Sequence, residues 1–185
     1  MIIGLTGTKA SGKGMVAKYL VSMGFNYISL SDIVREEARK NYEEEPDAEA
    51  LSKTGDCLRE KEGWGVLAKM ASERIGRGDY AVDGIRHPAE VEALRKLPGF
   101  FLISIDADRK LRYDRIAKRG RPDDPKTFED FLALDEEDKG VNEPPGGHKV
   151  LDTMALSDFK IDNNFGLDKL HKRIDEILSK VSSAK

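Results

Sequence analysis

Short apolar runs alternate with longer segments of helical periodicity along almost the whole chain. The runs that predict strands are residues 2–6, 26–30, 80–83, 100–105 and 159–161. The segments that predict helices are residues 13–23, 31–40, 48–61, 64–76, 88–97, 106–118, 150–155 and 167–181. Apolar strands that alternate with helices are typical of a parallel sheet covered on both faces. The pattern therefore predicts an α/β fold with five parallel strands and helices on both sides.

Two stretches depart from this alternation of strands and helices. Residues 31–78 are mostly helical, apart from an acidic surface connection at 41–47 and a break around Trp64, and this stretch has the character of an insertion. Residues from about 119 to 147 carry charge runs and most of the prolines around an amphipathic centre at Phe128 and Phe131, which predicts a lid with one helix. The remaining segments form the core of a single predicted domain, about residues 1–30, 79–118 and 148–185.

The amino-acid composition limits the classes of molecule that the protein is expected to bind. The 185 residues include 31 basic and 34 acidic side chains, a net charge of −3 that argues against a general binder of nucleic acid polymers or membrane surfaces. Cys57 is the only cysteine, which excludes an internal disulfide or a cysteine-based zinc cluster and favours a reducing compartment. With no basic leader and no long apolar segment, the expected location is the cytoplasm. The oligomeric state stays open.

A glycine-rich turn separates the first predicted strand from the first predicted helix. Such a turn aims backbone N–H groups at one point, and the helix N-terminus adds about half a positive charge there. With Lys13 it matches the G-x-x-x-x-G-K pattern of the P-loop, or Walker A motif, whose lysine reaches the outer phosphates. Gly14 stands where serine or threonine would offer a hydroxyl to Mg²⁺, so direct metal ligation by the loop is in doubt. The residues expected to contact the nucleotide are Gly7, Thr8, Lys9, Ala10, Ser11, Gly12, Lys13, Gly14 and Met15.

Charged pairs follow the second and third predicted strands. Asp32 and Arg35 come after one strand, and Asp83 and Arg86 after the other, so both pairs are expected at the sheet edge that carries Lys13. Arginine suits a phosphate because its planar fork makes paired hydrogen bonds, and an acid at a strand end can orient Mg²⁺ or its waters. The alternatives are a solvated helix arginine at Arg35, and a turn-capping acid with a surface base at Asp83 and Arg86.

At this point the chain resembles the nucleoside monophosphate kinase group of P-loop kinases over nearly its whole length. The segments that carry the resemblance are residues 7–14, 31–35, 82–86 and 115–119. The first is similar to the adenylate-kinase loop, except that Met15 replaces the usual threonine. The third looks like an Asp-Gly-Phe-Pro-Arg element shortened by one residue. The resemblance implies a three-layer P-loop NTPase fold, with an acceptor-binding insertion at about 31–78.

Within this group, two features bear on the acceptor. Asp83-Gly84-Ile85-Arg86 with the following residues, together with Ile161-Asp162-Asn163-Asn164, is most similar to dephospho-CoA-kinase-like and adenylate-kinase-related proteins. Residues 55–59 resemble a segment of deoxynucleoside monophosphate kinases. The acceptor therefore stays open between a nucleoside or deoxynucleoside monophosphate and dephospho-CoA.

The resemblance also implies roles for single residues. ATP would place its outer phosphates on the loop, Lys13 and Mg²⁺, with Asp83 holding the metal through water. Arg86 and Arg35 would grip the acceptor phosphate, assisted by Asp32 and Arg59. Arg115 and Arg119 would close on the transferring group, and the loop at Asn164 would lie against adenine. Arg112, Arg121 and the run from Asp135 to Asp138 are expected to be solvated.

These features predict an ATP-dependent kinase, a phosphotransferase that acts on a small phosphorylated acceptor. Phosphoryl transfer depends on positioning and charge neutralisation more than on covalent help from the protein. The alternative is a P-loop nucleotide-binding regulatory module, or a weak ATPase without an efficient acceptor, which the missing loop hydroxyl at position 14 and the shortened third motif would suit. The arginines expected at the acceptor and at the lid edge favour the kinase.

Overall fold

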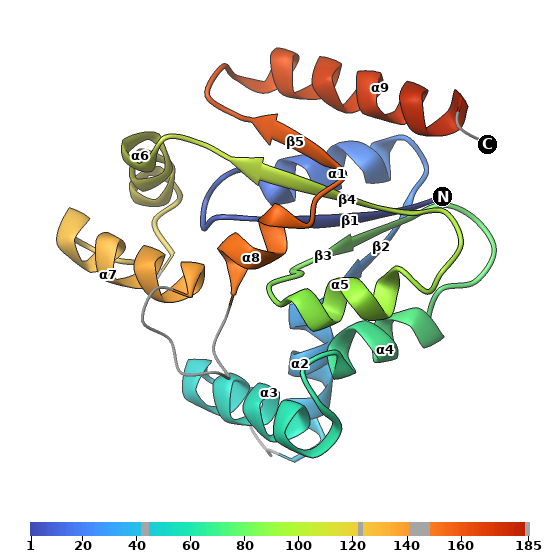
Figure 1. Cartoon of the computed structure of the whole chain (residues 1–185). Coiled ribbons are helices and arrows are strands. Elements are labelled where there is room, and N and C mark those ends of the chain that lie inside the picture. The colour runs from blue at the N-terminus through green and yellow to red at the C-terminus, as the bar shows by residue number, and fades with distance from the viewer. Residues whose placement is uncertain (42–44, 122–123, 141–148, 184–185) are drawn as a thin grey trace.

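The computed structural model describes residues 1–41, 45–121, 124–140 and 149–183. Its sheet has five parallel strands in the order β2-β3-β1-β4-β5, with β1 in the centre (Figure 1). The strands are β1 (Ile2–Gly7), β2 (Asn26–Ser29), β3 (Tyr80–Asp83), β4 (Phe100–Asp106) and β5 (Phe159–Asp162). Pairing of Gly7 with Ile105 and of Ser29 with Asp83 brings the carboxyl ends of the strands to one edge.

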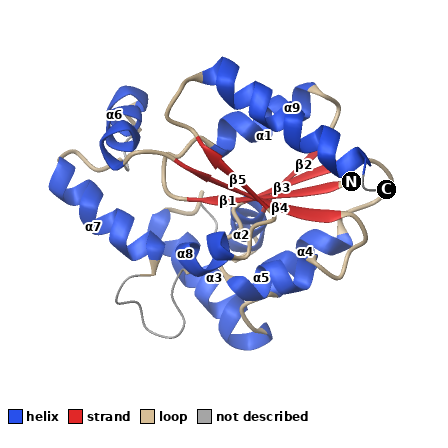
Figure 2. Ribbon diagram, turned by 45° about the horizontal axis from the view of Figure 1, so that its top comes forward, coloured by secondary structure: helices blue, strands red, loops and turns tan. Residues whose placement is uncertain are grey.

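Helices cover both faces of this sheet (Figure 2). They are α1 (Lys13–Ser22), α2 (Leu30–Arg39), α3 (Ala48–Glu62), α4 (Val66–Glu73), α5 (Pro88–Leu94), α6 (Arg109–Arg119), α7 (Phe128–Lys139), α8 (Val150–Ala155) and α9 (Leu167–Ser183). Helices α1 and α9 lie on one face, whereas α4, α5 and α8 lie on the other. The predicted three-layer fold is therefore confirmed.

Each face has its own hydrophobic core. Residues of β1 alternate between the two cores, with Ile3 and Leu5 packed against Val16 and Leu20 of α1 and against the buried side of α9. On the opposite face, Ile2 packs in a cluster that contains residues of α2, α4 and α5. Burial on both sides explains why β1 reads as one continuous apolar run.

The element boundaries differ from the predicted ones in places. The side chain of Ser29 caps α2 by accepting a hydrogen bond from the backbone N–H of Asp32, at 3.3 Å, so α2 begins at Leu30, one residue before the predicted helix over 31–40. Helix α6 begins at Arg109 rather than at Asp106, because Asp106 still pairs in β4. Val21 and Leu167, apolar residues of two predicted helices, are exposed.

The two stretches that interrupt the alternation of strands and helices, residues 31–78 and about 119–147, lie in different parts of the fold. Helices α2, α3 and α4 occupy the connection between β2 and β3, where they pack against one another. Helix α7 lies between α6 and α8 and contacts α8. Within the described ranges, none of the helices is long and apolar enough to cross a membrane. Part of the predicted lid, at 122–123 and 141–147, lies outside the described residues.

Candidate functional site

The turn between β1 and α1 has a backbone that only glycine fits at two positions. Gly7 has a φ of +142°, and a methyl group there would lie 1.9 Å from the carbonyl oxygen of Ile105. Gly12 has a φ of +108°, and a methyl group there would lie 2.2 Å from the side-chain nitrogen of Asn163. Both positions combine a left-handed conformation with close contact, which explains the glycine spacing of the motif.

Strand β4, the neighbour of β1 in the sheet, holds the beginning of this loop. The hydroxyl of Thr8, which is fully buried, donates a hydrogen bond of 2.5 Å to the carboxylate of Asp106 at the end of β4. The same carboxylate oxygen accepts the N–H of Ala107 at 2.9 Å. The Thr8 side chain therefore points toward the sheet, leaving only its backbone for a ligand.

The loop carbonyls are held outward by α6 and by the end of β5. The guanidinium of Arg112 donates to the carbonyl of Lys9 at 3.1 Å, and that of Arg115 donates to the carbonyl of Ser11 at the same distance. The side-chain amide of Asn163 also donates to Ser11, at 2.8 Å. In a trans peptide the N–H points opposite to the C=O, so outward carbonyls turn N–H groups inward. This is the arrangement of an anion cradle.

The cradle fits the phosphates of a nucleotide. The first N–H groups of α1 have no partner within the helix, and the helix dipole favours negative charge at that end. The hydroxyl of Ser11 is buried and has no hydrogen-bond partner among the described residues, so a ligand oxygen at the loop would satisfy it. Gly14 and Met15, by contrast, are exposed at the start of α1.

Lys13 is folded back onto the loop. Its ammonium donates to the carbonyl oxygens of Gly7 and Thr8, at 2.6 and 2.9 Å. Burial, followed by the nearby cation of Arg86, lowers the pKa of Lys13 from 10.5 to about 8, although Asp138 and Asp83 oppose the shift. A second cation therefore lies close enough to Lys13 to affect its protonation.

Asp83 is the last residue of β3, which lies next to β1 in the sheet. Its carboxylate accepts a hydrogen bond of 2.7 Å from the N–H of Gly84 and one of 3.3 Å from the hydroxyl of Tyr27. Burial and the Asp83 charge raise the pKa of Tyr27 to about 12, so Tyr27 stays a hydrogen-bond donor. Across the described part of the chain, no three His, Cys, Asp or Glu side chains converge as a metal site. Mg²⁺ fits here only as an ion carried on nucleotide phosphates, with Asp83 as one oxygen donor.

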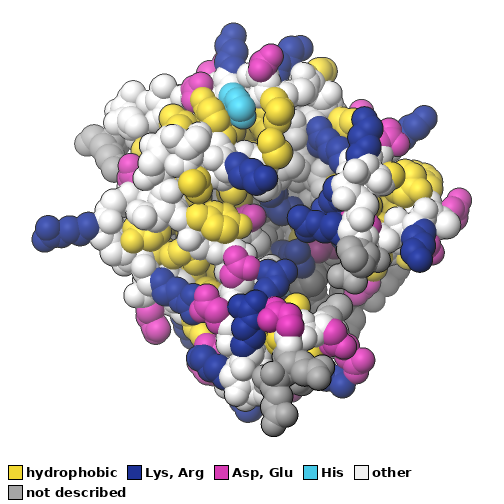
Figure 3. Space-filling view, turned by 180° about the vertical axis from the view of Figure 1, so that it is seen from behind, with side chains coloured by type: hydrophobic (Ala, Val, Ile, Leu, Met, Phe, Trp, Pro, Cys, Tyr) yellow, Lys and Arg dark blue, Asp and Glu magenta, His cyan; other side chains and the backbone are white. Residues whose placement is uncertain are grey.

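Arg86 leaves the end of β3 on a backbone fixed by a buried acid. The carboxylate of Glu90, which is 2% exposed, accepts the N–H groups of Arg86 and His87 at 2.8 and 3.1 Å. Burial raises the pKa of Glu90 to about 6. The Arg86 guanidinium lies 3.7 Å from the carboxylate of Asp138 on α7. Seen from behind, Lys and Arg side chains gather around a hollow near the middle of the molecule (Figure 3).

A second arginine, Arg59 of α3, approaches the same buried acid. Its side chain is only 13% exposed and makes a long ion pair of 3.4 Å with Asp56. The guanidinium lies 5.6 Å from the ring centroid of Trp64, and that ring stacks on His87 at 5.0 Å. The charges of Arg59 and Arg86 both lower the pKa of Glu90, so both guanidinium groups act electrostatically on the same carboxylate.

Arg35 and Asp32, unlike Arg59 and Arg86, pair with each other at the surface of α2. Their side chains form an ion pair of 2.5 Å within α2 and are 45% and 53% exposed. An exposed pair of this kind contributes little to stability. Arg35 is therefore paired on its own helix, whereas the charges of Arg59 and Arg86 both act on Glu90.

The two arginines expected at the edge of the lid have protein partners. Besides the Ser11 carbonyl, Arg115 reaches the carbonyl of Asn163 at 2.7 Å. Arg119 makes two hydrogen bonds to the carboxylate of Asp124, at 2.8 and 2.5 Å, and they lower the pKa of Asp124. Of these two arginines, Arg115 is therefore the one that contacts the loop in the described structure.

Two expectations about solvated charges were wrong. Arg112 is 2% exposed and makes a paired ion bridge to Asp135 of α7, at 2.5 and 2.9 Å, and Asp135 itself is 1% exposed. Burial alone would raise the pKa of Asp135, but hydrogen bonds from Arg112 and Lys139 bring it below the usual range. No signal in the charge run separated Asp135 from its neighbours, except its place on the same face of α7 as Phe131.

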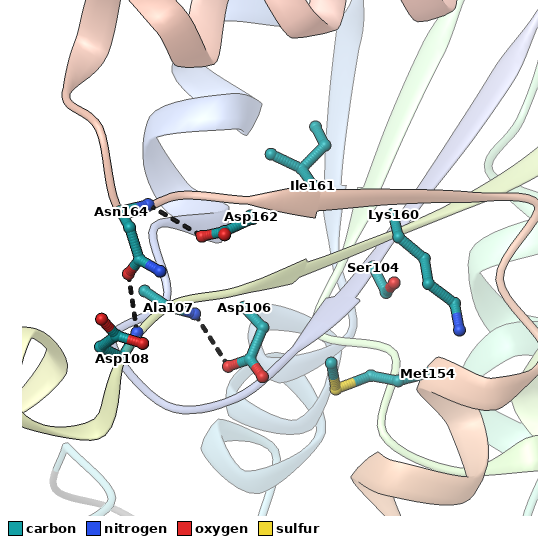
Figure 4. A pocket seen from close by; sticks show the side chains of 9 residues that line it. All are labelled: Ser104, Asp106, Ala107, Asp108, Met154, Lys160, Ile161, Asp162 and Asn164. Carbon is teal, nitrogen blue, oxygen red and sulfur yellow. Dashed lines mark hydrogen bonds between the residues drawn. The ribbon is translucent and has the colours of Figure 1, made fainter.

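Asn164 and the neighbouring pocket lie at the edge of the sheet. The side-chain oxygen of Asn164 accepts the N–H of Asp108, at 2.8 Å, and so joins the end of β5 to the start of α6. Next to it is an open pocket of about 370 Å³ (Figure 4). Its lining residues are Ser104, Asp106, Ala107, Asp108, Met154, Lys160, Ile161, Asp162 and Asn164. Through Asp106, this pocket adjoins the phosphate loop.

Comparison with known structures supports the fold. A structure of TT1252 from Thermus thermophilus aligns with a TM-score of 0.62 and 21% identity, covering 97% of both chains. Shikimate kinase from Aquifex aeolicus aligns with a TM-score of 0.55 and 16% identity over 100% of both chains. A sugar kinase from Janibacter aligns with a TM-score of 0.53 and 14% identity, covering 96% of this chain and 94% of that one. These likenesses show a P-loop kinase-like fold.

Comparison of sequences shows the family. Residues 3–139 match the family AAA_18, described as an AAA domain. A UPF0200 protein from Methanothermobacter thermautotrophicus is 37% identical, over 98% of this chain and 91% of that protein. A UPF0200 protein from Pyrococcus abyssi is 35% identical, over 98% of this chain and 97% of that protein. The chain therefore belongs to the AAA_18 family of AAA domains and, within it, groups with the UPF0200 proteins.

Proposed function

We propose that this protein is an ATP-dependent kinase that transfers the γ-phosphoryl group to a small acceptor which already carries a phosphate. The observation that carries the proposal is the closeness of Lys13 and Arg86. One cation belongs to the loop after β1 and the other follows β3, the parallel neighbour of β1, so both lie at the same edge of the sheet, and the charge of Arg86 lowers the pKa of Lys13. A protein that only bound a nucleotide would need the first cation alone.

The residues of the chain divide the work between two anionic substrates. The loop N–H groups and Lys13 hold the outer phosphates of ATP, and bound Mg²⁺ would neutralise charge on the transferring group. Arg86 binds the acceptor phosphate, and Glu90 fixes the backbone from which Arg86 projects. Arg115 keeps the loop carbonyls turned away from the phosphates. Asp83, whose charge acts on Lys13, would accept a hydrogen bond from a magnesium-bound water.

Arg59 is the better supported second anchor for the acceptor. Its charge acts on Glu90 together with that of Arg86, whereas Arg35 is paired with Asp32 on the surface of α2. The helices from α2 to α4 then form the acceptor-binding insertion, and the segment around α7 forms the lid. Nucleoside and deoxynucleoside monophosphates and dephospho-CoA are acceptors of this class, and the single exposed cysteine suits a cytoplasmic enzyme.

A panel of acceptors tests this proposal. Purified protein is incubated with Mg-ATP and with each nucleoside monophosphate, deoxynucleoside monophosphate and dephospho-CoA, while ADP and the phosphorylated product are measured. Shikimate and a simple sugar, taken from the names of the structural neighbours, serve as acceptors without a phosphate. We expect one phosphorylated acceptor to be used. Turnover of shikimate or sugar alone would contradict the acceptor class, and slow hydrolysis unaffected by any acceptor would support a regulatory module instead.

A further inference from the structure

The side chain of Arg112 is shared between the phosphate loop and α7. Its Nε donates to the carbonyl of Ala107 at 2.9 Å, and its Nη1 donates to the carbonyl of Lys9 at 3.1 Å. The two terminal nitrogens also bind the two carboxylate oxygens of Asp135, at 2.5 and 2.9 Å. Because the guanidinium is planar and rigid, one orientation satisfies all these acceptors together.

The carboxylate of Asp135 on α7 interacts with several basic side chains, two of which, Arg109 and Arg112, belong to α6. Besides Arg112, it accepts a hydrogen bond of 2.7 Å from Lys139 and lies 3.3 Å from the Nε of Arg109. The ring of Phe131, fully buried, lies 5.4 Å from the Arg112 guanidinium. Breaking a buried ion pair is strongly unfavourable because it leaves an uncompensated charge. The docking of α7 therefore holds Arg112 in place.

The loop backbone next to this contact is strained. Ala10 has a φ of +60°, and it is the only non-glycine residue with a positive φ among the described residues. The Lys9 carbonyl that Arg112 holds belongs to the same peptide unit as the Ala10 N–H. Pulling the carbonyl outward turns that N–H inward, toward the place for a phosphate. A conformation of this kind persists only where neighbouring groups impose it.

We propose that Arg112 is a positioning residue which makes the shape of the phosphate loop depend on the docking of α7. The carboxylate of Asp135 orients Arg112, Arg112 fixes the Lys9 carbonyl, and the Ala10 N–H then faces the nucleotide. By thermodynamic reciprocity, a nucleotide on the loop strengthens the docking of α7 by the same factor. The inference rests on the proposed binding of a nucleotide at the loop, but not on the identity of the acceptor.

Nucleotide affinity measured by calorimetry tests the first half of this coupling. Asp135→Asn keeps the size of the side chain but removes the charge that orients Arg112, and we expect ADP to bind at least about fivefold more weakly. The matched control is Glu136→Gln on the same helix, which breaks only the exposed pair with Arg109. That variant should bind ADP within about twofold of the unaltered protein, because exposed pairs are weak. Equal affinities in the two variants would overturn the proposal.

A second substitution separates positioning from a general loss of stability. Ala10→Gly removes the side chain that disfavours a positive φ, so the loop then depends less on Arg112. In this background Asp135→Asn should weaken ADP binding by a smaller factor than in the unaltered loop. An effect of the same size in both backgrounds would show that Asp135 acts only through stability.

Hydrogen exchange on the unaltered protein tests the reverse direction and needs no variant. ADP should slow amide exchange in α7, while exchange in α9 on the opposite face stays the same. Unchanged exchange in α7 when ADP is bound would overturn the coupling. If the unaltered protein bound no ADP at all, the proposed function would fail first, so the two failures are distinguishable.

Discussion

The side-chain amide of Asn163 donates a hydrogen bond of 2.8 Å to the carbonyl of Ser11, across 152 residues of sequence. The same nitrogen lies where a side chain at Gly12 would have to be placed, 2.2 Å from the position of its first carbon. The end of β5 therefore closes the phosphate loop from outside and leaves space only for glycine at position 12.

Gly12→Ala should disable the loop without unfolding the protein. The methyl group would clash with Asn163 and force a non-glycine residue to a φ of +108°, a strain of about 1–3 kcal/mol. If the loop relieves this strain by changing shape, ADP affinity falls about tenfold to 100-fold. Gly14→Ala is the control, because a methyl group at Gly14 meets nothing within 4 Å. Equal ADP affinities for the two variants would contradict this account.

Gly14→Ser should fold and bind Mg-nucleotide more tightly. The position is exposed in the first turn of α1, and serine has a higher helix propensity than glycine. The new hydroxyl stands where P-loops usually present one to Mg²⁺. Titrations of ADP with and without Mg²⁺ should show a larger effect of the metal in Gly14→Ser than in Gly14→Ala. The same metal effect in both would mean that the loop does not reach the ion.

The protonation of Lys13 should set the alkaline limit of activity. The cation is the binding form, and the pKa of about 8 means that the free protein loses it as the pH rises above 8. We expect kcat/KM for ATP to fall about tenfold per pH unit above this value. A profile that stays flat to pH 10 would exclude the assigned role.

Lys13→Met should abolish turnover yet stabilise the fold. Because the folded pKa of Lys13 is lower than the unfolded value of 10.5, the protonated lysine destabilises the folded protein below pH 8, and this penalty disappears toward pH 10.5. The shift corresponds to at most about 3 kcal/mol, reduced by the lost hydrogen bonds to Gly7 and Thr8. Urea unfolding at pH 7 should give a higher free energy of unfolding for Lys13→Met. A lower one would mean that those hydrogen bonds outweigh the desolvation of the charge.

Arg86→Ala should impair the acceptor side of the site. Loss of a charged hydrogen-bond donor is expected to raise the acceptor KM by about tenfold to 100-fold, and to change ADP affinity little. Arg35→Ala, which removes an exposed arginine paired with Asp32, is the comparison and should have a smaller effect. If Arg86→Ala altered only nucleotide affinity, Arg86 would belong to the ATP side.

Glu90→Ala should destabilise the protein more than Glu90→Gln. The alanine variant leaves two N–H groups, those of Arg86 and His87, without their acceptor, at about 1–3 kcal/mol for each group that stays buried. Glutamine keeps an oxygen acceptor and removes a charge whose burial raises its pKa to about 6. Thermal unfolding of both variants at pH 7 measures the difference. Equal losses would assign the effect to the charge rather than to the hydrogen bonds.

The fold could be predicted largely from periodicity. The run from Phe100 to Ile105 has apolar side chains pointing to both faces, and such a run has few alternatives to a central parallel strand. Tyr80 to Asp83 was predicted with the observed bounds for the same reason. Helix ends were less certain because caps compete: Ser29, Ser31 and Asp32 are all good capping residues, and only the sheet pairing of Ser29 with Asp83 decides among them.

The site was predictable where chemistry and spacing act locally, as in the phosphate loop. It was not predictable where charges meet across the fold. Arg112 and Asp135 each look solvated in sequence, and only the packing of α7 on α6 pairs them. Asn163 and Asn164 are neighbours of the same type, yet one closes the loop at Ser11 while the other binds Asp108. No local pattern separates such residues.

The residues that hold the phosphate loop in shape lie far behind it in the sequence, so they are synthesised after it. The motif at residues 7–14 is made first, but its partners Asp106, Arg112, Arg115 and Asn163 are made much later. A nascent chain that ends before Asp106 therefore contains the complete motif without any of these partners, and one that ends before Asn163 still lacks the amide that closes the loop at Ser11. The ability to bind phosphate should therefore appear only after Asn163 has been made, so that a bound nucleotide marks a chain synthesised at least through β5.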